Sequence, residues 1–171
     1  MASSCLDVTG SIDLSTLGLG CNTAPITGSR AVAGTFTANA DGTYVDQTTT
    51  SGEEQITLPQ TCLNVSGTEV RCEQIGPVIM SLGYDSAICA SAQNGTCLCD
   101  VSFTQSSGLG VPSFEPLQSG TFTTSGHTFT LNDGINAPTT YQYCSSGGQV
   151  ELLPLAPATG NLRGKIRLGE P

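Results

Sequence analysis

The sequence lacks several features on which common functions depend. Its 171 residues include no tryptophan, one histidine, and five lysine and arginine residues against fourteen aspartate and glutamate residues, for a formal net charge of −9. A negative charge of this size repels nucleic acid, whose binding depends on lysine and arginine. No glycine-rich phosphate loop is present, and no apolar run approaches the roughly 18 residues of a membrane-spanning helix. The sequence therefore predicts no nucleic-acid partner and no transmembrane segment.

Catalytic motifs are also missing. A serine triad would need a nucleophile elbow such as Gly-x-Ser-x-Gly, and none occurs. Strand alternation predicts that His127, the single histidine, shares a face with Phe129 and Leu131, which favours a partly buried structural imidazole over a general base. Asp41 and Asp46 lack the spacing of a calcium-binding loop and are interpreted as turn residues. We therefore predict no catalytic residue, no metal site and no cofactor.

Cysteine, by contrast, is abundant. Eight cysteines in a chain of this length are typical of disulfide-bonded proteins outside the cytoplasm. A zinc site would need closely spaced cysteine pairs, and only Cys97 and Cys99 are close in sequence. The sequence therefore predicts an extracytoplasmic protein, whether secreted, periplasmic or at the cell surface. The predicted disulfide cysteines are Cys5, Cys21, Cys62, Cys72, Cys89, Cys97, Cys99 and Cys144.

The pairing of these cysteines is less constrained, because eight cysteines allow 105 connectivities. Ala2-Ser3-Ser4-Cys5 resembles the trimmed end of a bacterial lipobox, so Cys5 has two interpretations, a lipid anchor and a disulfide partner. The even number of cysteines favours the disulfide, because lipidation of Cys5 would leave one thiol unpaired. Three short loops and one long-range tie give the predicted pairs Cys5–Cys21, Cys62–Cys72, Cys89–Cys97 and Cys99–Cys144.

Hairpin signatures are concentrated between Gln118 and Leu153. β-Branched and aromatic residues flank Ser125-Gly126, and others flank the second turn at 145–148. We predict a four-stranded antiparallel meander with strands at about 119–124, 127–131, 139–144 and 149–153.

The whole chain is predicted to be all-β, as a disulfide-stapled antiparallel β-barrel or sandwich of about eight to ten strands. Residues 1–30 are predicted as an irregular N-terminal arm pinned by cysteines, residues 31–153 as the β-domain, and residues 154–171 as a C-terminal segment. Turns are predicted at Asp41-Gly42 and Ser51-Gly52. A short helix is predicted at 76–83 and a further strand at 101–105.

Three hairpin segments carry a family resemblance. They are Asp41-Gly-Thr-Tyr, Ser119-Gly-Thr-Phe with Gly126-His-Thr-Phe-Thr-Leu, and Tyr141-Gln-Tyr-Cys with Gly148-Gln-Val-Glu-Leu. Over about residues 31–153 this pattern resembles the bacterial extracytoplasmic lipocalin-like proteins, many of which are lipoproteins. The resemblance implies a non-catalytic protein that binds a small apolar or amphiphilic ligand at the cell surface. Expected ligand-lining residues are Phe36, Ile56, Phe103, Phe122 and Leu152.

The last ten residues reverse the charge of the chain. Residues 1–161 carry thirteen acidic residues against two arginines, whereas residues 162–171 carry three cations against one acid. As a strand, this segment presents Arg163, Lys165 and Arg167 on one face and Ile166 on the other. Two interpretations are open: the last strand of this barrel, or an assembly strand added to a neighbouring copy. The second is the alternative function, a structural subunit of an extracellular assembly that associates with itself.

Overall fold

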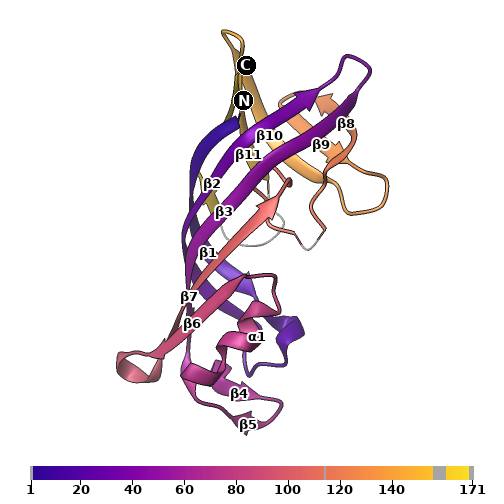
Figure 1. Ribbon diagram of the computed structural model, residues 1–171. Helices are drawn as coiled ribbons and strands as arrows, with labels where there is room; N and C mark the ends of the chain where they lie inside the picture. Colours follow the sequence, from indigo (N-terminus) through magenta and orange to yellow (C-terminus); the bar gives the residue numbers. More distant parts are fainter. Residues whose placement is uncertain (1, 114, 156–160, 170–171) are drawn as a thin grey trace.

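The computed structural model describes residues 2–113, 115–155 and 161–169, and the side chains of 6–113, 115–155 and 164–169 (Figure 1). Antiparallel strands dominate these residues. The long strands are β1 (Ala2–Asp13), β2 (Thr23–Ala38) and β3 (Thr43–Leu58). The other strands are β4 (Asn64–Val65), β5 (Thr68–Glu69), β6 (Ser86–Ser91), β7 (Cys97–Ser106), β8 (Ser119–Ser125), β9 (Thr128–Asn132), β10 (Thr139–Ser146), β11 (Gln149–Leu155), β12 (Asn161–Arg163) and β13 (Ile166–Gly169). The helical segments are η1 (Ser15–Leu17), η2 (Gln60–Leu63), η3 (Cys72–Gln74), α1 (Gly76–Met80) and η4 (Gln93–Gly95).

Eight of the strands form a nearly closed barrel. The order around it is β1, β2, β3, β8, β9, β10, β11 and β13, and β13 pairs with β1 again. The closing contacts place Ala2 and Val150 on either side of Leu168. Each strand of this ring has a partner on both sides, which leaves little open sheet edge.

The long strands continue past the barrel into a lower sheet. Residues 43–45 of β3 pair with β8, whereas residues 49–58 pair with β7, and β6 lies beyond β7. In Figure 1 the barrel occupies the upper part of the molecule, and β6, β7, α1 and the β4–β5 hairpin lie in the lower part. One continuous β3 therefore belongs to two differently built regions.

Each region has its own hydrophobic core. The upper core fills the barrel and contains Leu6, Val32, Tyr44, Leu109, Leu117, Phe129, Leu131, Tyr141, Leu152 and Ile166. The lower core lies between the lower sheet and the short helices and contains Val8, Ile12, Leu14, Ala24, Ile26, Ile56, Leu58, Cys62, Cys72, Ile75, Ile79, Cys89, Cys97, Cys99 and Val101. The upper core is partly aromatic, whereas the lower core is aliphatic and rich in cysteine.

Several sequence predictions are confirmed. The fold class is all-β and barrel-like, and the four strands predicted between Gln118 and Leu153 are β8 to β11 in consecutive order. The predicted short helix is α1. No helix among the described residues is both long and apolar enough to cross a membrane.

Two local predictions are wrong. Residues 1–30 are not an irregular arm, because residues 2–13 and 23–30 lie in β1 and β2, which pair along their lengths. Ser51-Gly52 is not a turn but lies inside β3. Gly52 is required there because the Phe103 ring lies against its backbone, where a Cβ atom would collide with the ring.

Candidate functional site

Polar side chains separate the two hydrophobic cores. Along β3 the inward positions alternate as the strand period requires, but between Tyr44 and Ile56 they carry polar groups instead of apolar ones. We call this layer the polar waist; its buried members are Arg30, Asp46, Thr48, Thr50, Glu54 and Ser107. Buried polar groups cost stability unless they are hydrogen-bonded, so the partners of these residues define the layer.

A buried ion pair lies in the polar waist. Arg30 of β2 and Glu54 of β3 are each 3% exposed, and Arg30 Nε donates to Glu54 Oε1 at 2.6 Å. Tyr84, which precedes β6, donates its hydroxyl to Glu54 Oε2 at 2.9 Å. Both carboxylate oxygens are therefore occupied by donors, as a buried charge requires.

Two aromatic rings cover the ion pair. The Phe103 ring centroid lies 5.8 Å from the Arg30 guanidinium carbon, and the Tyr84 ring meets Phe103 edge to face at 6.1 Å. Burial, together with the neighbouring Glu54 carboxylate, raises the pKa of Tyr84 well above its ordinary value. Tyr84 therefore remains a neutral hydrogen-bond donor across the physiological pH range, which makes it unsuitable as a base.

A cavity of about 360 Å³ opens beside these groups. Its walls come from five separate segments of the chain. Apolar and aromatic surface is contributed by Ile12, Leu82, Tyr84, Phe103 and Pro112. Polar surface is contributed by Asp13, Arg30, Thr104, Gln105 and Ser113. The volume lies within the range of roughly 300–1,000 Å³ that small-molecule sites have. The lining, with apolar walls and a few polar groups, is also typical of such sites.

A loop of the chain itself extends from the waist into the barrel. Residues 107–110 follow β7 and are buried, with Leu109 in the upper core. Four consecutive residues have left-handed backbone angles, including φ of 69° at Ser107 and 40° at Leu109. This conformation is costly for residues other than glycine, so surrounding contacts must maintain it. The barrel interior is thus occupied by protein at the place where a hollow barrel would hold a ligand.

Hydrogen bonds fix this inserted loop. Ser107 N donates to Thr48 O at 2.6 Å, and Gly110 N donates to Thr50 Oγ1 at 3.0 Å. The Gln105 amide joins the two ends of the loop, because its Nε2 donates to Ser107 O at 3.0 Å and to Val111 O at 2.8 Å. Since Gln105 also lines the cavity, the loop and the cavity share one wall.

Two buried oxygen atoms near the inserted loop have no hydrogen-bond partner among the described residues. They are Asp46 Oδ2 and Tyr44 Oη. Asp46 Oδ1 accepts from Thr48 N and Oγ1 at 2.9 and 2.7 Å, yet burial raises the pKa of the carboxyl above its ordinary value. Burial, with Asp133 and Asp46 nearby, raises the pKa of Tyr44 to about 12. Asp46 is therefore not the turn residue that the sequence suggested.

The five expected ligand-lining residues do not come together. Phe103 lines the cavity. Leu152 belongs to the upper core, Phe36 and Phe122 pack against it, and Ile56 lies in the lower core. Sequence reasoning missed Arg30, Glu54 and Tyr84. One signal was available, because Arg30 is one of only two cations before residue 162 and follows the period of a strand whose neighbours on that face are apolar.

Three disulfides are present among the described residues, and each predicted pair is wrong. The observed bonds join Cys21 to Cys62, Cys72 to Cys97, and Cys89 to Cys99. Cys21 reaches Cys62 because Gly20 lies against the Thr61 backbone, which brings the two loops together. Cys144 is exposed and has no disulfide. The side chain of Cys5 lies outside the described residues. Several disulfides indicate an oxidising environment.

The basic C-terminal strand lies in the barrel wall. Ile166 is fully buried in the upper core, between β1 and β11. Lys165 and Arg167 point outward and form ion pairs with Glu151, at 3.4 Å for Arg167. The side chain of Arg163 lies outside the described residues, although its backbone pairs with Asp7. To pair with a neighbouring copy, β13 would first have to leave its place in the barrel wall.

The remaining titratable candidate, His127, was misplaced. It is exposed in the turn between β8 and β9 rather than partly buried beside Phe129. The turn displaces it from the strand alternation on which the prediction was based.

Protein-family models, curated proteins and solved structures were all compared with this chain, and none matches it.

Proposed function

We propose that this protein is a non-catalytic extracytoplasmic binding protein that holds a small amphiphilic ligand in the cavity beside Arg30, Glu54, Tyr84 and Phe103. The observation that carries the proposal is the cavity itself, because it combines aromatic and aliphatic walls with a fixed polar group in a single, partly open space. The expected barrel-centre site is replaced, because the inserted loop occupies that position.

The residues that line the cavity support an amphiphilic ligand over a purely polar one. Leu82, Phe103 and Pro112 offer apolar contact, and Asp13 lies at the exposed rim. Asp13 Oδ1 accepts from Ser15 N at 2.8 Å, and the exposed carboxylate can accept a further hydrogen bond from a ligand. The buried ion pair adds an oriented dipole that need not reorganise when a ligand binds.

The setting of the proposal is outside the cytoplasm. The three disulfides support an oxidising compartment. A cell-surface location with a lipid on Cys5 belongs to the same proposal, and the exposed, unbonded Cys144 removes the argument that every cysteine must be paired. Intact-mass measurement with peptide mapping of protein isolated from its native cells tests this point. An added diacyl mass on the peptide containing Cys5 supports the anchor, and an unmodified Cys5 ends it.

Probe binding tests the cavity. We expect 1-anilinonaphthalene-8-sulfonate, an aromatic amphiphile, to bind one-to-one with saturable fluorescence. Leu82→Trp fills the cavity and should weaken binding at least tenfold. Ile88→Trp is the matched control, because Ile88 is 71% exposed on the outer face of β6 and lies outside the cavity. It should change the affinity less than twofold.

Equal affinities in the two variants, with unchanged melting temperatures, would show that the probe binds elsewhere and would contradict the proposal. Native mass spectrometry of the freshly purified chain complements this test, since a retained small molecule that Leu82→Trp removes would identify the natural ligand by mass.

A further inference from the structure

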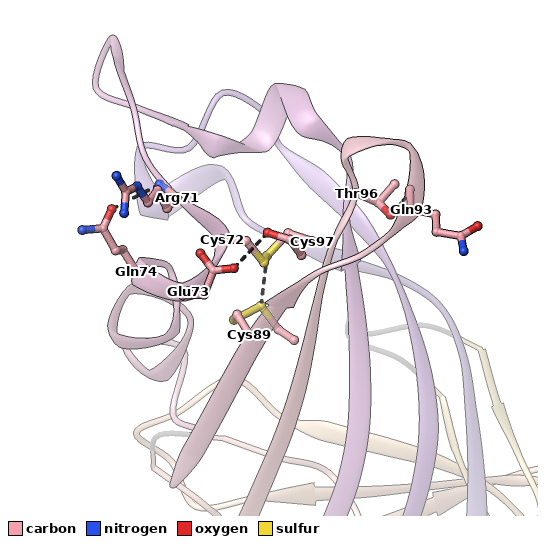
Figure 2. The surroundings of a disulfide bond; sticks show 10 residues. Arg71, Cys72, Glu73, Gln74, Cys89, Gln93, Thr96 and Cys97 are labelled. Carbon is pink, nitrogen blue, oxygen red and sulfur yellow. Dashed lines mark hydrogen bonds between the residues drawn. A yellow bond between two sulfur atoms is a disulfide. The ribbon is translucent and has the colours of Figure 1, made fainter.

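Four cysteine sulfurs from two disulfides lie together in the lower core. The Sγ atoms of Cys97 and Cys99 are 4.0 Å apart, and those of Cys89, Cys97 and Cys99 all lie within 4.8 Å of one another. Cys72 is bonded to Cys97 and so completes the group (Figure 2). All four side chains are buried, with exposed fractions of 0–8%. We call this group the four-sulfur cluster.

Backbone contacts, in addition to the sulfur bonds, position these sulfurs. Cys97 and Cys99 are two residues apart on β7, so both point to the inner face of the lower sheet. Cys89 lies directly opposite Cys99 in the β6–β7 ladder. Cys72 is held by η3, where Gln74 N donates to Arg71 O at 2.9 Å and Arg71 N donates to Gln74 Oε1 at 3.2 Å. Reduction therefore leaves four thiols facing one small volume.

We propose that the reduced chain binds one thiophilic divalent cation of the zinc class through Cys72, Cys89, Cys97 and Cys99. A tetrahedral site with metal–sulfur bonds of about 2.3 Å has sulfur–sulfur edges of about 3.8 Å. The contact between Cys97 and Cys99 already has nearly this length. The longest separation among Cys89, Cys97 and Cys99 exceeds it by about 1 Å, and the two bonded pairs need to separate after reduction.

The chemistry balances with a dithiol as reductant. Each of the two disulfides accepts two electrons and two protons from one dithiol, which itself becomes a disulfide. The four cysteine thiols then lose four protons as they bind the cation. In the reverse direction, two equivalents of an oxidising disulfide re-form Cys72–Cys97 and Cys89–Cys99 and release the cation. The same residues thus serve as a metal site in a reducing compartment and as two disulfides in an oxidising one.

An access route and an internal control are both present. A surface groove of about 570 Å³ is lined by Arg71, Cys72, Glu73 and Thr96, and Figure 2 shows these residues around the Cys72–Cys97 bond. The Cys21–Cys62 bond provides the control, because among the described residues no third metal-ligating side chain groups with its two sulfurs. Reduction of that pair should create no comparable site.

Anaerobic cobalt titration tests the proposal in a Cys144→Ser background, which removes the exposed thiol. After reduction with a phosphine and removal of the reductant, we expect one Co²⁺ per chain, with thiolate-to-cobalt charge-transfer bands and the visible bands of a tetrahedral site. The variant Cys97→Ala/Cys99→Ala should lose at least 100-fold in affinity. The matched variant Cys21→Ala/Cys62→Ala should bind as the parent does.

Alkylation mapping gives a readout that does not depend on the folding of a variant. In the reduced Cys144→Ser chain, Co²⁺ should protect Cys72, Cys89, Cys97 and Cys99 from iodoacetamide by at least tenfold in rate and leave Cys21 and Cys62 reactive. Equal alkylation of the four sulfurs with and without Co²⁺ would overturn the proposal, and so would loss of cobalt binding in Cys21→Ala/Cys62→Ala. Neither outcome depends on a ligand in the cavity, so this inference stands or fails separately from the proposed function.

Discussion

The upper and lower regions of the molecule are stabilised in different ways. In the barrel, strand pairing closes on itself and aromatic rings fill the interior, as in the stack of Phe36 on Tyr44 at 5.6 Å. In the lower region the sheet ends at β6, and three disulfides and short helices complete the core. Among the described residues, the disulfides all lie in the lower region. Covalent bonds are thus used where the backbone ladder does not close.

The polar waist lies between these two regions and belongs to neither core. A continuous apolar interior would be simpler to stabilise, because a buried ion pair often contributes no more than well-packed apolar side chains of the same volume. The waist instead borders the cavity through Arg30, and the proposed binding function would explain why Arg30 and its partner Glu54 are buried there.

The largest expected effect comes from removing the Cys21–Cys62 bond, which should loosen the lower region before the barrel. This bond joins residues 41 apart, and the chain-entropy relation gives a loss of about 4 kcal/mol when it is removed. We expect Cys21→Ala/Cys62→Ala to lower the free energy of unfolding by this amount in urea titrations. Hydrogen exchange should increase in η2 and η3 before it increases in β9 and β10. Simultaneous exchange in all four would contradict the two-region description.

The next effect concerns the waist. Glu54→Gln leaves the Arg30 guanidinium without its carboxylate, and breaking a buried ion pair from one side typically costs about 3–4 kcal/mol. The double variant Arg30→Met/Glu54→Leu removes both charges and should cost clearly less. Urea titrations of the two variants and the parent give the comparison. A double variant that is less stable than Glu54→Gln would show that the pair stabilises the fold rather than serving the cavity.

The third prediction concerns β13, the strand that closes the barrel, where Ile166→Ala should lower the free energy of unfolding by about 3 kcal/mol. Ile166 is fully buried where β13 closes the barrel, and truncation to alanine leaves a cavity in the upper core. Arg167→Ala is the control on the same strand, and it should cost under about 0.5 kcal/mol because its ion pair is exposed. Size-exclusion chromatography of Ile166→Ala also tests the assembly alternative. A parent that is oligomeric and becomes monomeric in this variant would favour strand exchange over simple closure.

The smallest effect depends on pH. Since burial raises the pKa of Asp46, the folded chain retains a proton at pH values where the unfolded chain has lost it, so stability falls as the pH rises through the folded pKa. Asp46→Asn should therefore stabilise by about 1 kcal/mol at pH 7, the scale for one buried unpaired polar group, and by less below the folded pKa. Thermal melts at pH 7 and at successively lower pH values measure the gain.

Asp41 serves as a control, because its substitution should change stability in the opposite direction to Asp46→Asn. Hydrogen bonds from the Thr43 hydroxyl and backbone N–H lower the pKa of this exposed carboxyl, so its ionised form contributes stability above the ordinary aspartate pKa. Asp41→Asn should lower the melting temperature slightly at pH 7. Changes of the same sign in both variants would contradict the assigned environments.

Local signals in the sequence predicted the barrel half well. The turns after β8 and β10 are short and glycine-containing, so the β8–β11 meander follows from nearest-neighbour pairing. The waist did not follow, because the contact between Arg30 and Glu54 joins residues 24 apart whose register is set by the complete β2–β3 pairing. Gly52 was misread as a turn, since a glycine that accommodates a neighbouring ring looks the same in sequence as one that reverses the chain.

The disulfide pairs failed for a related reason. Short loops are favoured in the unfolded chain, but the native pairs are chosen by strand register, as in Cys89 opposite Cys99, and by loop packing, as in Cys21 beside Cys62. The first is set by the register of the local β6–β7 hairpin, and the second by a contact between segments that are distant in sequence. The presence of disulfides, and with it an oxidising environment, was predictable from composition, whereas the pairing of the cysteines required the fold.

The most direct test of the binding site is amide chemical-shift mapping during titration with 1-anilinonaphthalene-8-sulfonate. The proposed cavity predicts saturable shifts confined to Leu82–Tyr84, Phe103–Gln105 and Ser113, with one dissociation constant for all of them. Shifts centred on the inserted loop at 107–110 or on the barrel strands β8 to β11, with the cavity amides unmoved, would contradict it.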